Sequence, residues 1–422
     1  MMPRDMEEVH SGDLESLKRR NKSLILSMIN QKGPISRAEL THQTDLSKVT
    51  ITRLVKELLE EEIVREIGLD VSSGGRRPIL LELNPDSGFV IGIDVGLESI
   101  CAGLTNLKGN ILIGVKRKNE VSQTGKELVQ RIKEVVDELL SQSDIRSDVR
   151  PDKIKGIGVS MPGLIDAKEG VVLFGHAVNE KKIPLRALMK EHFTYPVYVD
   201  NDANVGVLGE RYLGVGREVR NILYLHVKRH QKDRMSLGCS FVIDGRIYRG
   251  ASQTSGELGL RIPIEKVGSL KDEDVAGLLP WVIDPSFSEQ AVKQVLSGRP
   301  SLIKTMVKDN LEAVTFDTVM EAARKKDRVA LDVFDQIGHK LGARIAFLVD
   351  FLNPELVILG GDIVYAEELI LTPVREAVTR LAFEVPAQTV AIRLADVRGE
   401  FGACIGASYL VLSNLLQPVG GF

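Results

Sequence analysis

The amino-terminal part of the chain shows three stretches in which apolar residues recur at helical spacing. The first runs from Leu14 to Asn30 and the third from Lys48 to Glu61, each with apolar side chains on one helix face. Between them, Ser36 is followed three residues later by Glu39, which is the sequence of a capping box and predicts a short helix to about Thr44.

Two strand-like runs follow, Ile63–Leu69 and Arg77–Leu83, and the Ser- and Gly-rich stretch Asp70–Gly75 separates them. Three helices and a hairpin predict a winged helix-turn-helix. We place it at residues 14–84, after a flexible terminus at residues 1–13.

The rest of the chain predicts an α/β body of two lobes joined to this domain by a Pro- and Gly-containing linker at residues 85–88. The first lobe is assigned to residues 89–200 and 402–422, and the second to residues 201–401. The expected strands are Phe89–Val95, Ile100–Leu107, Asn110–Val115, Gly156–Ser160, Val197–Asp200, Asn221–Val227, Gly238–Ile243, Arg246–Tyr248 and Leu356–Leu359. The expected helices are Lys126–Gln142, Ser288–Leu296, Thr315–Lys325, Ala330–Leu352 and Gly402–Leu416.

Composition narrows the class of protein. The 55 Lys and Arg residues against 58 Asp and Glu give a net charge of −3, so a DNA-binding surface has to be a local patch. Cys101, Cys239 and Cys404 lie far apart in sequence, which argues against a disulfide scaffold and a thiolate metal site. With no signal-like start and no apolar run long enough to span a membrane, the sequence predicts a cytoplasmic protein.

The third helix has the residues of a DNA-reading helix. Arg can donate to guanine O6 and N7 in the major groove, and the methyl groups of Val and Thr can contact thymine. A helical protein-binding module with a polar face is the alternative. The candidate DNA contacts here are Ser47, Lys48, Val49, Thr50, Thr52 and Arg53. At the wing, Gly74 and Gly75 precede the cations Arg76 and Arg77, which suit phosphate or minor-groove contact.

Several motifs of the body resemble, in order and spacing, those of the ROK family (repressor, open reading frame, kinase). They are Gly92-Ile93-Asp94-Val95-Gly96, Ser160-Met161-Pro162-Gly163, Asp200-Asn201-Asp202-Ala203-Asn204, Ser255-Gly256-Glu257-Leu258-Gly259 and Asn353-Pro354-Glu355-Leu356-Val357-Ile358-Leu359-Gly360-Gly361. The wing resembles that of the repressor branch of this family. The resemblance implies a two-lobed actin-like fold of the sugar kinase and ribonuclease H-like type.

It also implies a sugar in the cleft between the lobes. By position, Asn201 and Asp202 would hydrogen-bond sugar hydroxyls, Glu257 would hold further hydroxyls, and Gly163 would line the cleft. In kinase members the residue at Asp202 is the general base. The alternatives are an Asx turn or helix cap for Asn201 and Asp202, and a surface or helix-capping carboxylate for Glu257.

The chain departs from the kinase pattern at both phosphate loops. Glu98 places negative charge in the first loop, and the segment Lys228–Leu237 replaces a glycine-rich second loop of which Gly238 remains. Because backbone amides approach phosphates closely where side chains are absent, we expect nucleotide binding to be lost. Leu260 stands where the family has a zinc-binding His, so we expect neither ATP nor zinc as a cofactor.

Together these features predict a cytoplasmic, sugar-responsive transcriptional regulator, a repressor of carbohydrate-utilisation genes, whose sugar-kinase-like body is catalytically silent. Its expected partners are operator DNA, a sugar or sugar-derivative effector and a second copy of the chain. One alternative is a sugar kinase that retains a DNA-binding extension. Another is a body that serves as a dimerisation scaffold and does not respond to small molecules.

Overall fold

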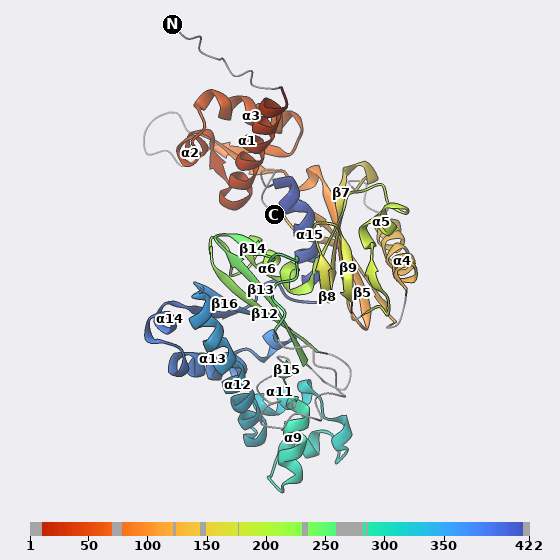
Figure 1. Cartoon of the computed structure of the whole chain (residues 1–422), viewed down its shortest axis with the longest axis vertical. Coiled ribbons are helices and arrows are strands. Elements are labelled where there is room, and N and C mark those ends of the chain that lie inside the picture. The colour runs from red at the N-terminus through yellow and green to blue at the C-terminus, as the bar shows by residue number, and fades with distance from the viewer. Residues whose placement is uncertain are drawn as a thin grey trace. The chain divides into compact units, whose positions relative to one another are not determined.

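The computed structural model describes residues 11–69, 78–120, 124–143, 149–175, 177–229, 235–258, 282–283 and 286–416 (Figure 1). The chain divides into two compact units. The first contains the residues up to Pro162, residues 169–200 and the residues from Ala403 onwards, and the second contains residues 163–168 and 201–402. Within the described residues, every helix is too short or too polar to cross a bilayer.

The first unit begins with the predicted winged helix-turn-helix. Its three strands form a small sheet in the order β1-β3-β2. The two-residue strand β1 was not predicted, because so short a strand has no periodicity to detect. The elements are α1 (Ser11–Lys32), β1 (Ile35–Ser36), α2 (Arg37–Gln43), α3 (Lys48–Glu60), β2 (Val64–Leu69) and β3 (Ile79–Leu83).

The predicted capping box sets the start of α2. The Ser36 hydroxyl accepts a hydrogen bond from the Glu39 backbone N–H at 3.2 Å, and the Glu39 carboxylate accepts one from the Ser36 N–H at 2.8 Å. This second bond lowers the pKa of Glu39 below its ordinary value, because the backbone donor favours the charged form. Leu40 of α2 and Leu54 of α3 then lie fully buried in the domain core.

A five-stranded sheet in the order β11-β7-β4-β5-β6 forms the centre of the first lobe. Strand β4 is parallel to β7 and antiparallel to β5. Helix α4 packs on β5 and β6, and β9 pairs with β10. The elements are β4 (Phe89–Val95), β5 (Ser99–Asn106), β6 (Ile111–Lys118), α4 (Gly125–Ser143), β7 (Ile154–Met161), β9 (Val171–Gly175), β10 (Lys181–Ile183), α5 (Leu185–Lys190), β11 (Val197–Asn201) and α15 (Gly402–Leu416). Strands β9 and β10 and helix α5 were not predicted.

Helix α15 has the bounds that the sequence predicted, and it closes the first lobe through glycine contacts. A Cβ on Gly92 of β4 would overlap the backbone carbonyl of Cys404, and one on Gly158 of β7 would overlap that of Ala407. The helix backbone therefore lies directly on the two central strands, at a distance that a larger residue would not permit.

An ion network ties the winged domain to this lobe. The carboxylate of Glu82 on β3 accepts from Arg65 on β2 at 2.6 Å and from Lys108, in the β5–β6 turn, at 2.8 Å. The Lys108 bond, with that of Arg65, holds the pKa of Glu82 below its ordinary value. The hydroxyl of Tyr409 on α15 donates to the Lys108 carbonyl at 3.3 Å. The predicted linker is a packed 3-10 turn, η1 (Pro85–Ser87), whose Pro85 carbonyl accepts from the Leu107 N–H.

The second unit is built on a sheet in the order β14-β13-β12-β16-β17, with β15 paired to β13. Strands β12, β16 and β17 are parallel to one another, and β13 runs antiparallel to β12. The strands are β8 (Gly163–Asp166), β12 (Ile222–Arg229), β13 (Met235–Ile243), β14 (Arg246–Tyr248), β15 (Val282–Ile283), β16 (Leu356–Gly361) and β17 (Ala391–Leu394). The helices are α6 (Asp202–Tyr212), α9 (Phe287–Leu296), α10 (Leu302–Met306), α11 (Phe316–Arg324), α12 (Arg328–Leu352), α13 (Glu368–Leu381) and α14 (Glu384–Thr389).

The two faces of this sheet carry different helices. Leu223 and Leu225 of β12 point into the larger core, which contains Phe287, Phe316 and Phe334 of α9, α11 and α12. Ile222 and Tyr224, one residue out of phase, point to the opposite face, where α6 packs. Helices α9, α11 and α12 were predicted; α6, α10, α13 and α14 and strands β8, β15 and β17 were not.

We predict that Gly92→Ala destabilises the first lobe. The added methyl group would overlap the Cys404 backbone, so α15 has to move, at a cost of about 1 to 3 kcal/mol in unfolding free energy. The measurement is the urea midpoint of the full chain. Gly216→Ala is the matched control, because the nearest atom to its new methyl group is the flexible end of the Ile222 side chain. Equal midpoints for the parent and Gly92→Ala would contradict the close packing of α15.

Candidate functional site

The first turn of α3 is fixed by its cap. The Ser47 hydroxyl accepts from the Thr50 backbone N–H at 3.2 Å and lies 2.9 Å from the Thr50 hydroxyl. The Thr52 hydroxyl donates back to the Lys48 carbonyl at 2.8 Å. Ser47 is thus the predicted N-cap, and the hydroxyls of both threonines already have partners within the helix.

The same helix separates a buried face from an exposed one. Ile51 is completely buried, whereas the Val49 side chain is 78% exposed. Lys48, Thr52 and Arg53 are also exposed and Thr50 is half-buried. An apolar Val beside a cation and a hydroxyl at the start of a helix offers the chemistry that contacts thymine methyls and base edges. Arg76 and Arg77 lie outside the described residues, so the wing contacts stay a prediction.

Two lysines near this surface serve the fold. Lys18 of α1 pairs with Glu57 of α3 at 3.0 Å, and Lys22 pairs with Glu61 at 2.5 Å. The Lys18 bond lowers the pKa of Glu57, with a smaller contribution from the charge of Arg53. These ion pairs attach α1 to the carboxyl-terminal end of α3 and leave the exposed first turn of α3 as the candidate DNA-reading surface.

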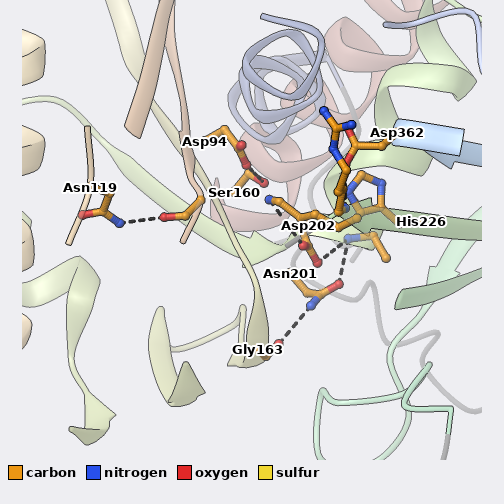
Figure 2. A network of polar contacts seen from close by, with 12 residues as sticks. Asp94, Asn119, Ser160, Gly163, Asn201, Asp202, His226 and Asp362 are labelled. Atoms are coloured by element: carbon orange, nitrogen blue, oxygen red, sulfur yellow. Dashed lines mark hydrogen bonds and ion pairs between the residues drawn. The ribbon is translucent and has the colours of Figure 1, made fainter. Parts of the chain in front are cut away.

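The predicted sugar residues of the second unit gather where β11 leads into α6. The Asn201 side-chain oxygen accepts from the Ala203 N–H at 2.8 Å and caps α6, while its side-chain nitrogen donates to the Gly163 carbonyl at 2.9 Å (Figure 2). Gly163 has a φ of 134°, a conformation that favours glycine. The helix-cap alternative is therefore correct for Asn201, and the cap places Gly163 beside it. Whether the second lone pair of the Asn201 oxygen also binds sugar stays a prediction.

Asp202 is the first residue of α6, where the helix dipole favours a negative charge. One carboxylate oxygen accepts from the Ala203 N–H at 3.0 Å, and the other lies 3.9 Å from the Lys228 ammonium of β12. Both side chains are largely buried. This ion pair was not predicted from the sequence. It gives the Asp202 carboxylate a cationic partner on β12.

Glu257 is held near Asp202 by the glycine before it. Gly256 has a φ of 96°, and a Cβ there would overlap the Cys239 carbonyl of β13, so the chain passes closely over that strand. Much of the Glu257 side chain is exposed, but its carboxyl end is partly desolvated. That desolvation, and then the charge of Asp202, raise the pKa of Glu257. Two carboxylates and an amide thus offer several acceptors for the hydroxyls of a polyol.

The turn at the first phosphate-loop position is closed by its own hydrogen bonds. The Gly96 N–H donates to the Ser99 carbonyl, and the Asn119 side chain donates to the Gly96 carbonyl at 2.6 Å (Figure 2). The Asn119 N–H donates to the carbonyl of Glu98, whose side chain is exposed. The Gly96 amide, which in a phosphate loop would point to the ligand, is engaged in this turn.

At the second phosphate-loop position the predicted loop is partly wrong. Strands β12 and β13 continue past the expected ends, with Lys228 paired to Ser236 and Arg229 to Met235. The Arg229 N–H donates instead to the carboxylate of Asp362 at 2.6 Å. The Arg229 N–H, a backbone donor next to this loop, is therefore hydrogen-bonded to the Asp362 carboxylate. Asp362 was not predicted, although its position directly after Gly360-Gly361 is a signal that could have found it.

The described residues offer one poor group of metal ligands. Asp335, His339 and Glu376 lie together on the surface of the second unit. His339 has Asp335 on the Nδ1 side at 3.3 Å and Glu376 on the Nε2 side at 3.7 Å, so the two carboxylates flank the ring instead of sharing one centre. Leu260 lies outside the described residues, and the absence of a zinc site stays a prediction.

The family models match both parts of the chain. The ROK family model matches residues 90–414, and a winged helix-turn-helix DNA-binding model matches residues 18–65. The chain belongs to the ROK family. It is 30% identical over 412 residues to the xylose repressor of Caldicellulosiruptor bescii, an alignment that covers 96% of this chain and 98% of that protein.

Solved ROK structures confirm the predicted fold. The chain is similar to a ROK family transcriptional regulator described as a homolog of the E. coli MLC protein, with a TM-score of 0.77, 23% identity and coverage of 96% and 98% of the two chains. It is also similar to a ROK family glucokinase from Streptomyces griseus, solved with glucose and AMPPNP. That TM-score is 0.63 at 22% identity, over 76% of this chain and 99% of the glucokinase. The body of this ROK protein therefore has the sugar-kinase fold, with the winged domain added before it.

We predict that Arg53→Ala weakens binding to a specific operator by about 1 to 3 kcal/mol, the range for loss of a bidentate Arg–guanine contact. The measurement is fluorescence anisotropy with labelled operator at fixed salt. Lys56→Ala is the matched control, because Lys56 is exposed on the same helix and pairs with Glu60. Lys56→Ala should keep the parent's affinity, and the same affinity in Arg53→Ala would remove Arg53 from the reading surface.

Proposed function

We propose that this ROK protein is a cytoplasmic, sugar-responsive transcriptional repressor whose kinase-like body senses its effector without phosphorylating it. The observation that carries the proposal is the capped first turn of α3, with Val49 exposed beside Lys48, on a chain whose body has the ROK fold. A capped helix with an exposed first turn suits the major groove of DNA, and a sugar-kinase fold supplies a place for a regulating ligand. The xylose repressor to which the chain is similar along nearly its full length supports the same function.

The local chemistry of the two phosphate positions supports a silent body. The Gly96 N–H is hydrogen-bonded within its own turn, and the Arg229 N–H donates to Asp362. A phosphate loop needs free backbone N–H groups pointing at the ligand. Lys228 adds a second obstacle because its ammonium is paired with Asp202, the residue at the position of the kinase base. The rival function, a sugar kinase with a DNA-binding extension, requires all of these contacts to rearrange.

We predict no hexokinase-like activity. Full-length protein with ATP, Mg²⁺ and a panel of sugars should form no sugar phosphate above the background of a chain with Asp202→Ala. The measurement is coupled ADP release confirmed by product analysis. Turnover on the order of 1 per second or faster, lost in Asp202→Ala, would establish the kinase function instead.

The effector site of the proposal consists of Gly163, Asn201, Asp202 and Glu257. Regulation then follows from linkage: a ligand that binds one conformation of the body more tightly shifts the population, and DNA affinity changes by the same coupling free energy. Because helix-turn-helix proteins commonly read two half-sites, we propose that two copies bind one operator. Xylose is the first sugar to test, given the name of the relative, and glucose and N-acetylglucosamine follow.

We predict that Asp202→Asn weakens the response to the effector and preserves operator affinity. The substitution keeps the size and the acceptor oxygen but removes the charge, and a charged acceptor bond contributes about 1.5 to 3 kcal/mol, or about a 10- to 150-fold change in ligand affinity. The effector is found by thermal-shift screening and then titrated against the protein–operator complex.

The control for this titration is Asp244→Asn, the same chemical change at an exposed carboxylate paired with Arg220 in the same unit. A midpoint that shifts in Asp202→Asn and stays fixed in Asp244→Asn supports the site. The same midpoint in the parent and in Asp202→Asn would remove Asp202 from the sensing site. If no sugar changes operator binding of the parent, the body is a dimerisation scaffold.

A further inference from the structure

His226 lies on β12 between two glycines of the neighbouring strands. The register pairs it with Gly238 of β13 on one side and with Gly360 of β16 on the other. Residues paired across a sheet point to the same face, so neither glycine places a side chain beside the imidazole ring. His226 follows Tyr224 by two residues and therefore points to the face where α6 packs, and it is half-buried. The two glycines thus leave the ring uncovered by its strand neighbours.

The space above Gly238 joins His226 to the proposed effector site. A Cβ built on Gly238 would lie 3.8 Å from the Cβ of His226 and 3.9 Å from the Oδ1 of Asp202 (Figure 2). The Cβ of Ala203, at 3.3 Å, borders the same space on a third side. A carboxylate accepts hydrogen bonds and an imidazole N–H donates one. Asp202 and His226 can therefore bind one ligand hydroxyl from two sides.

A buried tyrosine holds the His226 ring in place. The Tyr224 hydroxyl lies 3.2 Å from Nδ1 of His226, and the two rings stack with centroids 6.0 Å apart. This hydroxyl occupies room that two other glycine positions provide: a Cβ would lie 2.5 Å from the Tyr224 oxygen on Gly206 of α6 and 2.1 Å from it on Gly360. Larger residues at these positions would displace the hydroxyl from the imidazole.

The direction of this hydrogen bond follows from the burial of Tyr224. Burial, and then the charges of Glu210 and Asp202, raise the pKa of Tyr224, so the phenol keeps its proton. A buried O–H without an acceptor costs more than an oxygen lone pair without a donor, and the structure describes one hydrogen bond of this hydroxyl. The Tyr224 hydroxyl therefore donates to Nδ1 of His226. In a neutral imidazole the ring hydrogen is then on Nε2.

A donor at His226 complements the groups already placed in the effector site. The two carboxylates of the site accept hydrogen bonds, and the Asn201 side-chain nitrogen donates to the Gly163 carbonyl. Each sugar hydroxyl both donates and accepts, so its full recognition also needs a protein donor. The Lys228 ammonium, paired with Asp202, is a charged one. The Nε2–H of His226 adds a neutral donor beside this pair.

We propose that His226 is a ligand-binding residue of the effector site, whose Nε2–H donates to the sugar hydroxyl that itself donates to Asp202. Tyr224 is its positioning residue, because it fixes the ring and the tautomer without touching the ligand. An analogue without this hydroxyl would leave both protein groups without their ligand partner, so the pair selects sugars that carry it. This inference rests on the proposed function, since it names a further contact and a specificity determinant of the same site.

The test compares His226→Leu, which removes the N–H, with His226→Gln, whose side-chain amide restores a donor. The probes are xylose, glucose and N-acetylglucosamine with their monodeoxy analogues, titrated against the full chain by calorimetry. We expect the recognised sugar to bind His226→Leu about 10-fold more weakly, and His226→Gln to keep most of the parent's affinity. His339→Gln is the matched control, because His339 lies on the surface of the same unit, and it should bind like the parent.

The analogues separate a direct contact from a structural role. One monodeoxy analogue should bind the parent weakly and lose little further affinity in His226→Leu, so that the two losses are non-additive by about 10-fold. The other analogues should show additive losses. Tyr224→Phe should weaken sugar binding in the parent and have no further effect in the His226→Leu background. Tyr248→Phe, at an exposed tyrosine of the same unit, is its control.

The parent's sugar affinity in His226→Leu, or additive losses for every analogue, overturns the inference and leaves the proposed function standing. Circular dichroism and operator affinity check that each variant is folded. If His226→Leu does not fold, His226→Asn takes its place, because its shorter amide does not reach the Nε2 position and should lose affinity in the same way. If no sugar of the panel binds the parent, the sensing function fails and the inference fails with it.

Discussion

The close contact of α15 with the central sheet of the first lobe is the constraint on which that unit depends. The last helix of the chain returns to the strands that begin the body, and Gly92 and Gly158 let its backbone rest directly on β4 and β7. Tyr409 of the same helix bonds the turn that carries Lys108, and Lys108 reaches Glu82 of the wing hairpin. The position of the winged domain on its lobe therefore depends on contacts that the end of the chain completes. A change at these contacts would therefore alter the position of the winged domain on its lobe even where the linker is unchanged.

In the second unit, the proposed loss of phosphate chemistry rests on a few side chains. Its sheet keeps the arrangement of the fold, with α6 on one face and the long helices on the other. The contacts that support this proposal lie at strand ends: β12 and β13 extend into the second phosphate position, Asp362 accepts from the Arg229 backbone, and Lys228 pairs with Asp202. The carboxylates and amide that suit a polyol remain.

The helix cap at Asn201 is compatible with the proposed effector role of this region. The side chain fixes the start of α6 and the carbonyl of Gly163, and in doing so places Asp202 at the positive end of the helix dipole. Burial raises the pKa of Glu257, and the Lys228 ammonium lies beside Asp202 in the same small region.

The sequence by itself determined the local elements. Several local features could be predicted because each depends on residues a few positions apart. They are the capping box at Ser36, the cap at Ser47 and the periodicity of α12 and α15. The motif order also indicated the family and its fold. Tertiary structure decided what depends on distant partners: the Lys228–Asp202 pair, the Asp362 contact and the Glu82 network. Helix α6 was not predicted because its first residues also fit a sugar-binding loop. Helix α13 was not predicted because Pro373 lies inside it. Periodicity reports which face of an element is apolar, but whether a neighbour covers that face is settled by residues far away in the chain.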